Sequence, residues 1–583
     1  MNGGNVIAQI LREEGVRFIF TLCGGHISPI LVGCKKEGIR VLDVRDEANA
    51  VFAADASARM TGIPGVAAVT AGPGVTNSIT ALVNARMAQS PLVLLGGAAA
   101  TVLKGRGSLQ DIDQLGLVRS AVKKHIPIRK NCDIIPILQN AFRIAKSGVP
   151  GPVFVECPID LLYEEELVRE WYGVKGSESS GYGIRSRILH LYLRRHVDRM
   201  YACDFNSMKP EKKKAPEGGF SMRQIRKAGR MVSQAERPLM IVGSQAMLHP
   251  DEAERLADAV RKIGVPVYLN GMARGLLGGN DRLQFRHKRK AALRDADLVI
   301  LAGIPCDFRL DYGRDINPKA KLISINRSKA DLYLNRHMYM NRRPDLPLHG
   351  DPFIFLCVMS EMMGTVSVGQ EWLNALIRRE SEREREIDAM AKEPVEYINP
   401  VLLHKKIAGR IGENSIIVAD GGDFVGTASY IVRPARPLSW LDPGVFGTLG
   451  VGAGFAMGAA LCRPGKEVWI LYGDGAAGYS LQEFDTFARH GIPVIAVIGN
   501  DACWSQIYRD QVVYLKDPVG TTLEYSEYHK VAEAYGGAGF VITSANQIDA
   551  VLDAAQDAAR SGKPVLINAF IGKTDFRKGS ISM

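Results

Sequence analysis

Short apolar runs alternate with longer amphipathic segments along almost the whole chain. Near the N-terminus the runs VAAVTAG, PLVLLGGA and PVFVECP are separated by segments with helical periodicity. Continuous apolar runs of this length, alternating with helices, are typical of parallel strands that are buried on both faces. The pattern predicts an α/β fold built from doubly wound parallel sheets.

The same alternation occurs in three blocks, which predicts three domains. We place them at residues 1–170, 219–360 and 399–583. A basic linker, 171–218, and a charged linker, 361–398, connect them. The second linker contains QEWLNALIRRESEREREIDAMAKE, which we expect to form a solvated helix.

Composition and cysteine usage narrow the class of protein. The chain is 46% hydrophobic and 23% charged, which is typical of globular domains. Its nine cysteines form no CxxC pair, and we therefore expect a reducing compartment with no disulfide framework and no cysteine metal site. No signal peptide is evident, and the apolar stretch 445–462 is too short for a confident membrane span.

The charge balance bears on partners. The net charge of +11 suits an anionic ligand or a membrane surface, and we expect no nucleic-acid partner. The segment IRSRILHLYLRRHVDRMY, residues 184–201, mixes Arg with Ile, Leu and Tyr. Such a segment could lie on a membrane surface, or it could be a linker helix that packs on its own protein.

One motif combines an acid with a glycine loop. The strand-like run VWILYG ends in Gly473-Asp474-Gly475, and Gly478 completes the spacing G-x-G-x-x-G. In a dinucleotide fingerprint the loop faces a pyrophosphate directly, and an Asp there would repel it. A cation between the two charges removes the conflict, which predicts that Asp474 binds a divalent metal that bridges a diphosphate.

A hard cation such as Mg²⁺ needs further oxygen ligands. After the next apolar run, IPVIAVIGN, comes Asn500, and 24 residues separate it from Gly475. This distance accommodates one helix and a return strand. Two adjacent parallel strands would then present Asp474 and Asn500 at their carboxyl ends, where α/β sheets bind ligands.

The pair resembles the signature of the thiamine-diphosphate-dependent enzymes, in which GDG is followed by 24 to 27 residues and Asn. The resemblance implies three doubly wound domains: pyrimidine-binding, central and diphosphate-binding. It implies thiamine diphosphate and Mg²⁺ as cofactors. It also implies that Asp474, Asn500 and the Ala502 backbone carbonyl are the metal ligands, with Gly473, Gly475 and Ala476 beside the diphosphate.

The chemistry of this family also needs one buried carboxyl group, because a carboxyl at N1′ of the aminopyrimidine activates the cofactor. The segment VRDEANAVFAADASARMTG resembles the corresponding family segment, with Glu47 at the catalytic position. The alternative is that Glu47 only favours a helix N-terminus.

Further matches follow the family order. TAGPGVTN resembles the turn that walls the pyrimidine pocket, with Gly72 and Gly74, and Gln110 matches an active-site Gln or is an ordinary loop residue. GTLGVGAGFAMGA implies a cofactor contact at the Gly447 carbonyl and an apolar wedge at Leu449. Gly422 and Asp423 lie where the family has a second diphosphate loop.

Within the family the chain resembles the acetolactate-synthase-like, or 2-hydroxyacyl-CoA lyase, group. The resemblance implies cleavage of a 2-hydroxyacyl-CoA to formyl-CoA and an aldehyde one carbon shorter, as in fatty acid α-oxidation. Acetolactate-synthase-type ligation of 2-keto acids and a non-catalytic, cofactor-binding homologue are the alternatives. Residues 219–360 carry no clear FAD signature.

The resemblance also implies a quaternary structure and a cellular location. The active sites would lie at the subunit interface of a homodimer or homotetramer, with an acyl-CoA-type substrate. Relatives of this group associate with the endoplasmic reticulum membrane, and cytoplasmic localisation is the alternative.

Overall fold

The computed structural model describes residues 2–175, 184–203, 219–335, 343–364, 366 and 368–579. The chain divides into two compact units. The first holds residues 1–59, 63–216 and 445–448, and the second holds residues 60–62, 217–444 and 449–583.

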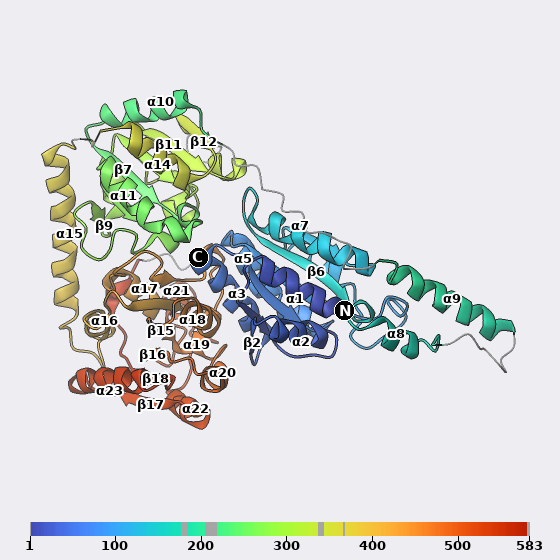
Figure 1. Ribbon diagram of the computed structural model, residues 1–583. Helices are drawn as coiled ribbons and strands as arrows, with labels where there is room; N and C mark the ends of the chain where they lie inside the picture. The colour runs from blue at the N-terminus through green and yellow to red at the C-terminus, as the bar shows by residue number, and fades with distance from the viewer. Residues whose placement is uncertain are drawn as a thin grey trace. The chain divides into compact units, whose positions relative to one another are not determined.

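The first unit is built on a six-stranded parallel sheet of strand order β2-β1-β3-β4-β6-β5. Figure 1 labels β2 and β6 of this sheet. Its strands are β1 (Phe18–Thr21), β2 (Arg40–Asp43), β3 (Gly65–Val69), β4 (Leu92–Ala98), β5 (Lys124–Pro127) and β6 (Pro152–Pro158). Every residue of β3, β4 and β6 is buried, because helices cover both faces of the sheet.

Helices of the first unit follow the amphipathic segments of the sequence. They are α1 (Gly3–Glu13), α2 (Ser28–Lys36), α3 (Glu47–Thr61), α4 (Pro73–Asn77), α5 (Ile79–Met87), α6 (Gln114–Val118), α7 (Ile134–Lys146), α8 (Glu165–Trp171) and α9 (Ile184–Met200). In α1, for example, Val6, Ile7, Ile10 and Leu11 recur at helical spacing and are buried, and the Asn2 side chain caps the first turn.

Two further six-stranded parallel sheets lie in the second unit. The first has the order β12-β11-β10-β7-β8-β9. Its strands are β7 (Pro238–Val242), β8 (Val267–Leu269), β9 (Gln284–Phe285), β10 (Leu298–Ala302), β11 (Lys321–Asn326) and β12 (Leu346–His349). Its helices are α10 (Met222–Ser233), α11 (Ala253–Ile263), α12 (Arg289–Asp295), α13 (Lys329–Leu332) and α14 (Pro352–Met362), and the long helix α15 (Gln370–Met390) follows.

The last sheet has the order β14-β13-β15-β16-β18-β17. Its strands are β13 (Ser415–Asp420), β14 (Trp440–Leu441), β15 (Glu467–Gly473), β16 (Ile495–Asn500), β17 (Ala538–Ile542) and β18 (Val565–Phe570). Its helices are α16 (Pro400–Ala408), α17 (Asp423–Ile431), α18 (Val451–Cys462), α19 (Asp474–Ala477), α20 (Glu483–His490), α21 (Ser505–Leu515), α22 (Tyr528–Ala534) and α23 (Ile548–Arg560). The three parallel sheets confirm the predicted fold class.

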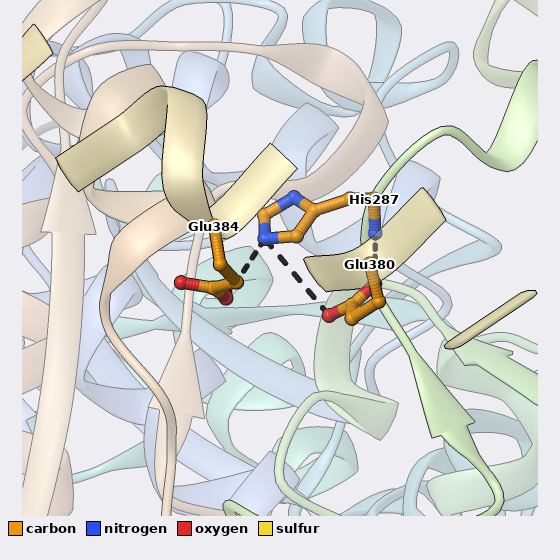
Figure 2. A group of neighbouring side chains, drawn as sticks. All are labelled: His287, Glu380 and Glu384. Carbon is orange, nitrogen blue, oxygen red and sulfur yellow. Dashed lines mark hydrogen bonds and ion pairs between the residues drawn. The ribbon is translucent and has the colours of Figure 1, made fainter. Parts of the chain in front are cut away.

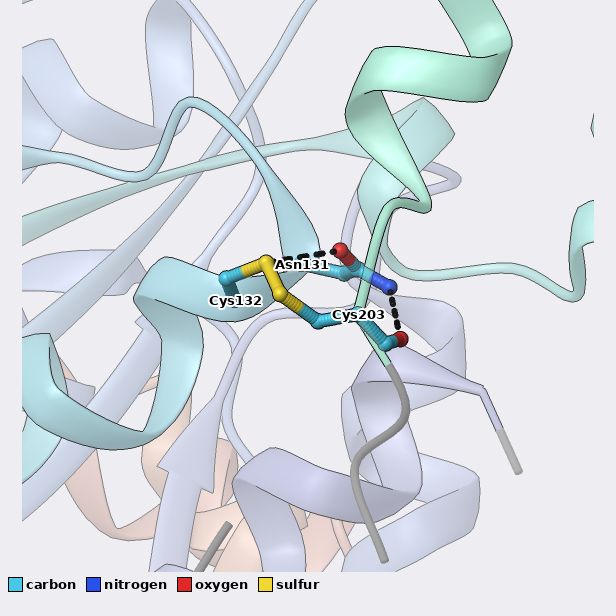
Figure 3. The surroundings of a disulfide bond; sticks show 3 residues. All are labelled: Asn131, Cys132 and Cys203. Atoms are coloured by element: carbon cyan, nitrogen blue, oxygen red, sulfur yellow. Dashed lines mark hydrogen bonds between the residues drawn. A yellow bond between two sulfur atoms is a disulfide. The ribbon is translucent and has the colours of Figure 1, made fainter. Parts of the chain in front are cut away.

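Two expectations need correction. Cys132 and Cys203 form a disulfide with a Cα–Cα distance of 5.5 Å, and Asn131 donates from Nδ2 to the Cys203 carbonyl (Figure 3). The expectation of no disulfide framework missed this bond, because a single pair 71 residues apart leaves no spacing pattern in the sequence. The reducing compartment inferred from cysteine usage therefore loses its basis.

The charged linker is a helix, α15, but it is not simply a solvated one. Trp372, Leu376 and Ile387 are buried, and Arg379 pairs with Asp295 of α12. Some side chains of this charged segment are therefore buried or paired, and they hold α15 against its neighbours.

Within the described residues, no helix is both long and apolar enough to cross a membrane.

Candidate cofactor site

Three loops leave neighbouring strands at the same edge of the last sheet. Asp420 of β13 is in register with Tyr472 of β15, and Gly473 of β15 is in register with Gly499 of β16. Since parallel strands end at a common edge about 4.8 Å apart, the loops after β13, β15 and β16 are adjacent. This edge is where an α/β sheet binds its ligands.

Asp474 begins α19 directly after β15, and its side chain is buried, with the residue 3% exposed. One carboxylate oxygen accepts from its neighbour Gly475 N at 2.8 Å, and the other accepts from Cys503 N, in the loop after β16, at 3.2 Å. Burial raises the pKa of Asp474 to about 6, against the lowering effect of these backbone donors. In the described part of the chain no Lys or Arg pairs with this carboxylate.

Asn500 ends β16 and is fully buried. Its amide Nδ2 donates to Asn568 Oδ1 at 3.1 Å and to the Ser526 carbonyl at 3.3 Å, which leaves Oδ1 with one long contact from Ala502 N, 3.3 Å away. Ala502 has φ of 51°, a left-handed conformation that costs an alanine about 1–2 kcal/mol. Its carbonyl accepts from Leu523 N at 2.7 Å and retains a second lone pair.

These residues fit a hard divalent cation. A carboxylate, an amide oxygen and a backbone carbonyl form an all-oxygen donor set of the kind that Mg²⁺ prefers. A second acid lies beside them, since burial and then the neighbouring Asp474 carboxylate raise the pKa of Asp501 to about 7. Lys573 offsets only part of this effect at Asp501. Two buried acids side by side raise the energy of the charged state, and a bound divalent ion would lower it.

The glycine after Asp474 is required by packing. A Cβ atom at Gly475 would lie 2.4 Å from the Trp504 ring, in the loop after β16. Gly475 and Ala476 therefore lie close to the loop after β16, and they directly follow Asp474 and the end of β15 at Gly473. Trp504 thus packs against the glycine loop.

The third loop carries Gly422 and Asp423. Asp423 begins α17, and its carboxylate forms an ion pair with Arg509 of α21 through Oδ2, while its Oδ1 is buried without a hydrogen-bond partner. Gly422 approaches the Gln506 side chain, since a Cβ there would lie 2.8 Å from Gln506 Oε1. Asp423 therefore has an unused acceptor at this edge of the sheet.

Asp420 is a functional candidate that the sequence reasoning missed. It is fully buried at the end of β13, and its two carboxylate oxygens accept from Gly450 N at 3.1 Å and Gly452 N at 2.8 Å. The side chain thereby fixes the N-terminus of α18, which follows Leu449. The signal was present, because SIIVADGG ends an apolar strand in Asp-Gly just as WILYGDG does.

Gly447 and Leu449 precede α18. Gly447 has φ of 65° and is exposed, and Leu449 is half-buried. The structure therefore places both residues just before the helix whose first turn Asp420 holds.

In the first unit, Glu47 is the first residue of α3 and is 5% exposed. Its Oε2 accepts from Asn77 Nδ2 of α4 at 3.0 Å. The turn that carries Gly74 lies against the same carboxylate, since a Cβ on Gly74 would lie 3.4 Å from Glu47 Oε1. A buried carboxyl with one neutral donor can hold a proton at a ligand nitrogen.

The turn before α4 depends on glycine. Gly72 has φ of 63°, which a residue with a side chain rarely adopts, and its N–H donates to Gln114 Oε1 at 3.4 Å. The Gln114 side chain is buried and also donates to the Gly97 carbonyl at 2.9 Å and to Glu156 at 3.1 Å. The sequence analysis did not single out Gln114, whose side chain supports this turn through its hydrogen bond with Gly72 N.

Gln110 lies beside Thr70 and His26. Thr70 Oγ1 is 3.5 Å from Gln110 Oε1 and 3.2 Å from His26 Nδ1. Gln110 has φ of 63°, and burial lowers the pKa of His26. The hydroxyl group of Thr70, the first residue after β3, therefore lies between the side chains of Gln110 and His26.

A second group of side chains has the composition of a metal site (Figure 2). His287, Glu380 and Glu384 hold ligand atoms within 4.8 Å of one another, and His287 Nε2 lies 3.0 Å from Glu384 Oε1. However, Arg433 pairs with Glu384 at 2.6 Å, and Arg286 lies 3.6–3.7 Å from both carboxylates. Because two guanidinium groups already neutralise the acids, we interpret the group as an ionic cluster that holds α15.

Comparisons with known proteins agree with this geometry. Three family models match: "Thiamine pyrophosphate enzyme, N-terminal TPP binding domain" at residues 1–117, the central domain at 225–357, and the C-terminal TPP binding domain at 420–569. The protein named 2-hydroxyacyl-CoA lyase 2 of Danio rerio is 48% identical over 587 residues, which cover all of this chain and 93% of the relative.

Two further relatives extend the comparison. The Homo sapiens protein of the same name is 48% identical, with 100% and 92% of the two chains covered. A protein named probable acetolactate synthase from Mycobacterium bovis is 31% identical over 97% of this chain and 95% of its own length. Together with the three matched domains, these relatives show that the chain belongs to the thiamine pyrophosphate enzyme family.

Proposed function

We propose that the protein is a thiamine-diphosphate- and Mg²⁺-dependent lyase that cleaves a 2-hydroxyacyl-CoA to formyl-CoA and an aldehyde one carbon shorter. The observation that carries the proposal is that buried Asp474 and Asn500 lie at the carboxyl ends of the adjacent strands β15 and β16, in a chain that matches relatives named 2-hydroxyacyl-CoA lyase 2 over its whole length. The reaction balances without an oxidant: the bond between C1 and C2 breaks, the C2 hydroxyl loses its proton to become the aldehyde, and the former C1 carbon gains a proton.

Asp474, Asn500 and the Ala502 carbonyl would hold the cation. The single buried carboxylate supplies the charge, and the two neutral oxygens complete the protein's share of the ligands. Gly473, Gly475 and Ala476, with Gly422 and Asp423 on the next loop, would surround the diphosphate. The Gly447 carbonyl would accept a hydrogen bond from the cofactor, and Leu449 would be an apolar wedge beside it.

Thiamine diphosphate, when bound, would supply a nucleophilic carbon and a thiazolium ring that acts as the electron sink for the bond that breaks. Glu47 would hold a proton at N1′ of the aminopyrimidine, with Asn77 keeping its carboxylate in place. Gln110 would face the substrate, positioned by Thr70, whose hydroxyl also meets His26.

Acetolactate-synthase-type ligation of 2-keto acids is the second candidate function. It is favoured by the 31% identical relative named probable acetolactate synthase. The higher identity to the proteins named 2-hydroxyacyl-CoA lyase 2 places cleavage first. A cofactor-binding homologue without turnover ranks third, because Glu47, Asp474 and Asn500 are all present.

The family resemblance supports further parts of the proposal. We propose a homodimer or homotetramer with active sites at the subunit interface, a role in fatty acid α-oxidation, and association with the endoplasmic reticulum membrane. We also propose that the three domains occupy residues 1–170, 219–360 and 399–583, with the linkers between them.

A parallel product assay separates the candidate functions. Purified protein is incubated with Mg²⁺, thiamine diphosphate and either a 2-hydroxyacyl-CoA or pyruvate. Formyl-CoA and aldehyde in equal amounts support the lyase, whereas acetolactate from pyruvate without CoA cleavage would replace it with the synthase. Tight cofactor binding with neither product would favour the non-catalytic homologue.

A further inference from the structure

Helix α9 has two different faces. Its C-terminal half packs on the first unit: Val197 and Met200 are buried, Leu193 packs against the core, and His196 Nε2 lies 2.7 Å from Thr101 Oγ1. The disulfide at Cys203 fixes the chain just beyond the helix. These contacts anchor one end and one face of α9.

The N-terminal half presents apolar side chains to solvent. Ile184, Ile188, Leu189, Leu191 and Tyr192 are all between 48% and 78% exposed. Ile184, Ile188 and Leu191 follow the i, i+4, i+7 spacing and so form one stripe, on the side of the helix opposite Leu193 and Val197. In Figure 1 this half of α9 extends away from the sheet of its own unit.

Cations border the apolar stripe on both sides. At 100° per residue, Arg187 and Arg194 lie on one side of it and Arg185 lies on the other, and Arg195 and Arg199 follow beyond its C-terminal end. Within the described ranges none of these five arginines forms an ion pair or a side-chain hydrogen bond. Asp198, which is the one acid in 184–200, is already paired with Arg169 of α8 at 2.6 Å.

We infer that α9 is an interfacial helix that docks the protein on an anionic phospholipid surface. Aliphatic side chains flanked by arginines are the pattern of helices that lie in the headgroup region, with the apolar stripe in the acyl boundary and the cations at the phosphates. Such a contact uses two features of α9, the apolar stripe of its N-terminal half and the arginines along the helix that have no ion-pair partner among the described residues.

Other occupants fit less well. A second copy would bring one arginine-rich stripe against another and would add like-charge repulsion. A protein partner would need about 800 Å² per side, whereas an exposed half-helix of nine residues is only about 13 Å long. Lipid binding needs no such area or shape match, because the side chains insert individually.

Vesicle co-sedimentation of the full chain tests the inference without reference to turnover. Vesicles of phosphatidylcholine with one quarter phosphatidylserine should bind the protein at least about tenfold more tightly than pure phosphatidylcholine, and 0.5 M NaCl should remove the difference. Equal binding to both vesicles, or to neither, would overturn the inference.

Matched variants assign the binding to α9. Ile188→Glu, and separately the pair Arg187→Gln with Arg195→Gln, should each weaken binding about tenfold. Ile377→Glu and the pair Arg378→Gln with Arg385→Gln place the same changes on exposed positions of α15 and should leave binding unchanged. Undiminished binding of the α9 variants, or self-association that Ile188→Glu abolishes, would contradict the lipid surface as the occupant.

Discussion

The Asp474 carboxylate accepts a hydrogen bond from the Cys503 backbone N–H at 3.2 Å, although 29 residues separate the two in sequence. The contact joins the glycine loop after β15 to the loop after β16 that follows Asn500. This hydrogen bond holds the two loops together at the edge of the sheet, and the buried Asp474 carboxylate pairs with no Lys or Arg among the described residues. The cofactor proposal depends on this edge.

Replacing Asp474 with Asn tests the metal ligand. The variant keeps the size of the side chain but removes the one formal charge that would bind Mg²⁺, and we expect the affinity for thiamine diphosphate with Mg²⁺ to fall about 100-fold. The measurement is the rise in the thermal unfolding midpoint with cofactor. Asp557→Asn, on the exposed surface of α23, is the control and should respond like the wild type. A normal cofactor response of Asp474→Asn would refute its role.

Glu47→Gln separates binding from catalysis. The amide keeps the shape of the side chain but cannot hold the proton in the same way, and we expect turnover to fall about 10²–10⁴-fold with cofactor affinity nearly unchanged. Steady-state kinetics and calorimetric binding on one preparation measure both quantities. The exposed Glu166→Gln of α8 serves as the control. If Glu47 only stabilised the start of α3, turnover would survive and the unfolding midpoint would fall.

Gln110 can be tested with a control of the same backbone conformation. Gln110 and Gln89 both have positive φ, 63° and 58°, and Asn tolerates this region. Gln110→Asn shortens the side chain, so we expect kcat/KM to fall about 10-fold or more while cofactor affinity holds. Gln89→Asn should retain wild-type kinetics. Identical kinetics for both variants would make Gln110 an ordinary loop residue.

The ionic cluster of His287, Glu380 and Glu384 predicts an acid-sensitive stability. Burial raises the pKa of Glu384, but hydrogen bonds and charges from His287 and Arg433 outweigh it and lower the pKa to about 2. Because the folded pKa lies below the unfolded one, the contribution is complete above about pH 4.5 and is lost as the pH falls toward 2. After allowance for solvent screening, Glu384→Gln should lower the unfolding free energy at pH 7 by about 1–2 kcal/mol.

Denaturant unfolding at pH 7 and pH 3 measures this difference, with exposed Glu382→Gln as the control. The gap between Glu384→Gln and wild type should shrink at pH 3. Zn²⁺ in the same experiment distinguishes the alternative, because a metal site would raise the wild-type midpoint and lose that rise in Glu384→Gln. Such a rise would show that the cluster binds a metal ion although Arg286 and Arg433 lie beside its carboxylates.

The disulfide predicts a redox-dependent stability. Cross-linking residues 71 apart lowers the entropy of the unfolded chain and should stabilise the fold by about 4 kcal/mol. Cys203→Ser should therefore unfold at lower denaturant than wild type under oxidising conditions, and dithiothreitol should bring the wild type down to the same midpoint. Cys23→Ser removes an exposed free cysteine and should change neither value. An oxidised wild type that unfolds like Cys203→Ser would show that the bond does not stabilise the fold.

The sequence predicted the sheets well for a physical reason. Buried parallel strands such as β4 and β16 need continuous apolar runs, and a run of this kind is visible without any neighbour. The spacing of Asp474 and Asn500 was equally readable, because one crossover helix and one strand occupy a nearly fixed number of residues.

Features that depend on distant contacts were not readable. The pairing of Cys132 with Cys203 needs η1 (Asn131–Asp133) and the chain just after α9 to meet. The role of Gln114 depends on three partners, one in the turn before α4 and two in strands β4 and β6. Asp420 could have been singled out from the sequence, but its role is visible only in the structure, where its carboxylate accepts from backbone N–H groups at the start of α18. The charged residues of α15 were predicted to be solvated, because a sequence does not show which charged side chains form ion pairs.

Titration calorimetry of thiamine diphosphate into the wild-type protein tests the central claim most directly. One sample contains Mg²⁺, and the other is treated with EDTA to remove divalent ions. If Asp474 and Asn500 hold a cation that carries the diphosphate, saturable binding at one site per chain should occur with Mg²⁺ and weaken by about 100-fold or more without it. Equal binding in both samples, or no binding in either, would contradict the account.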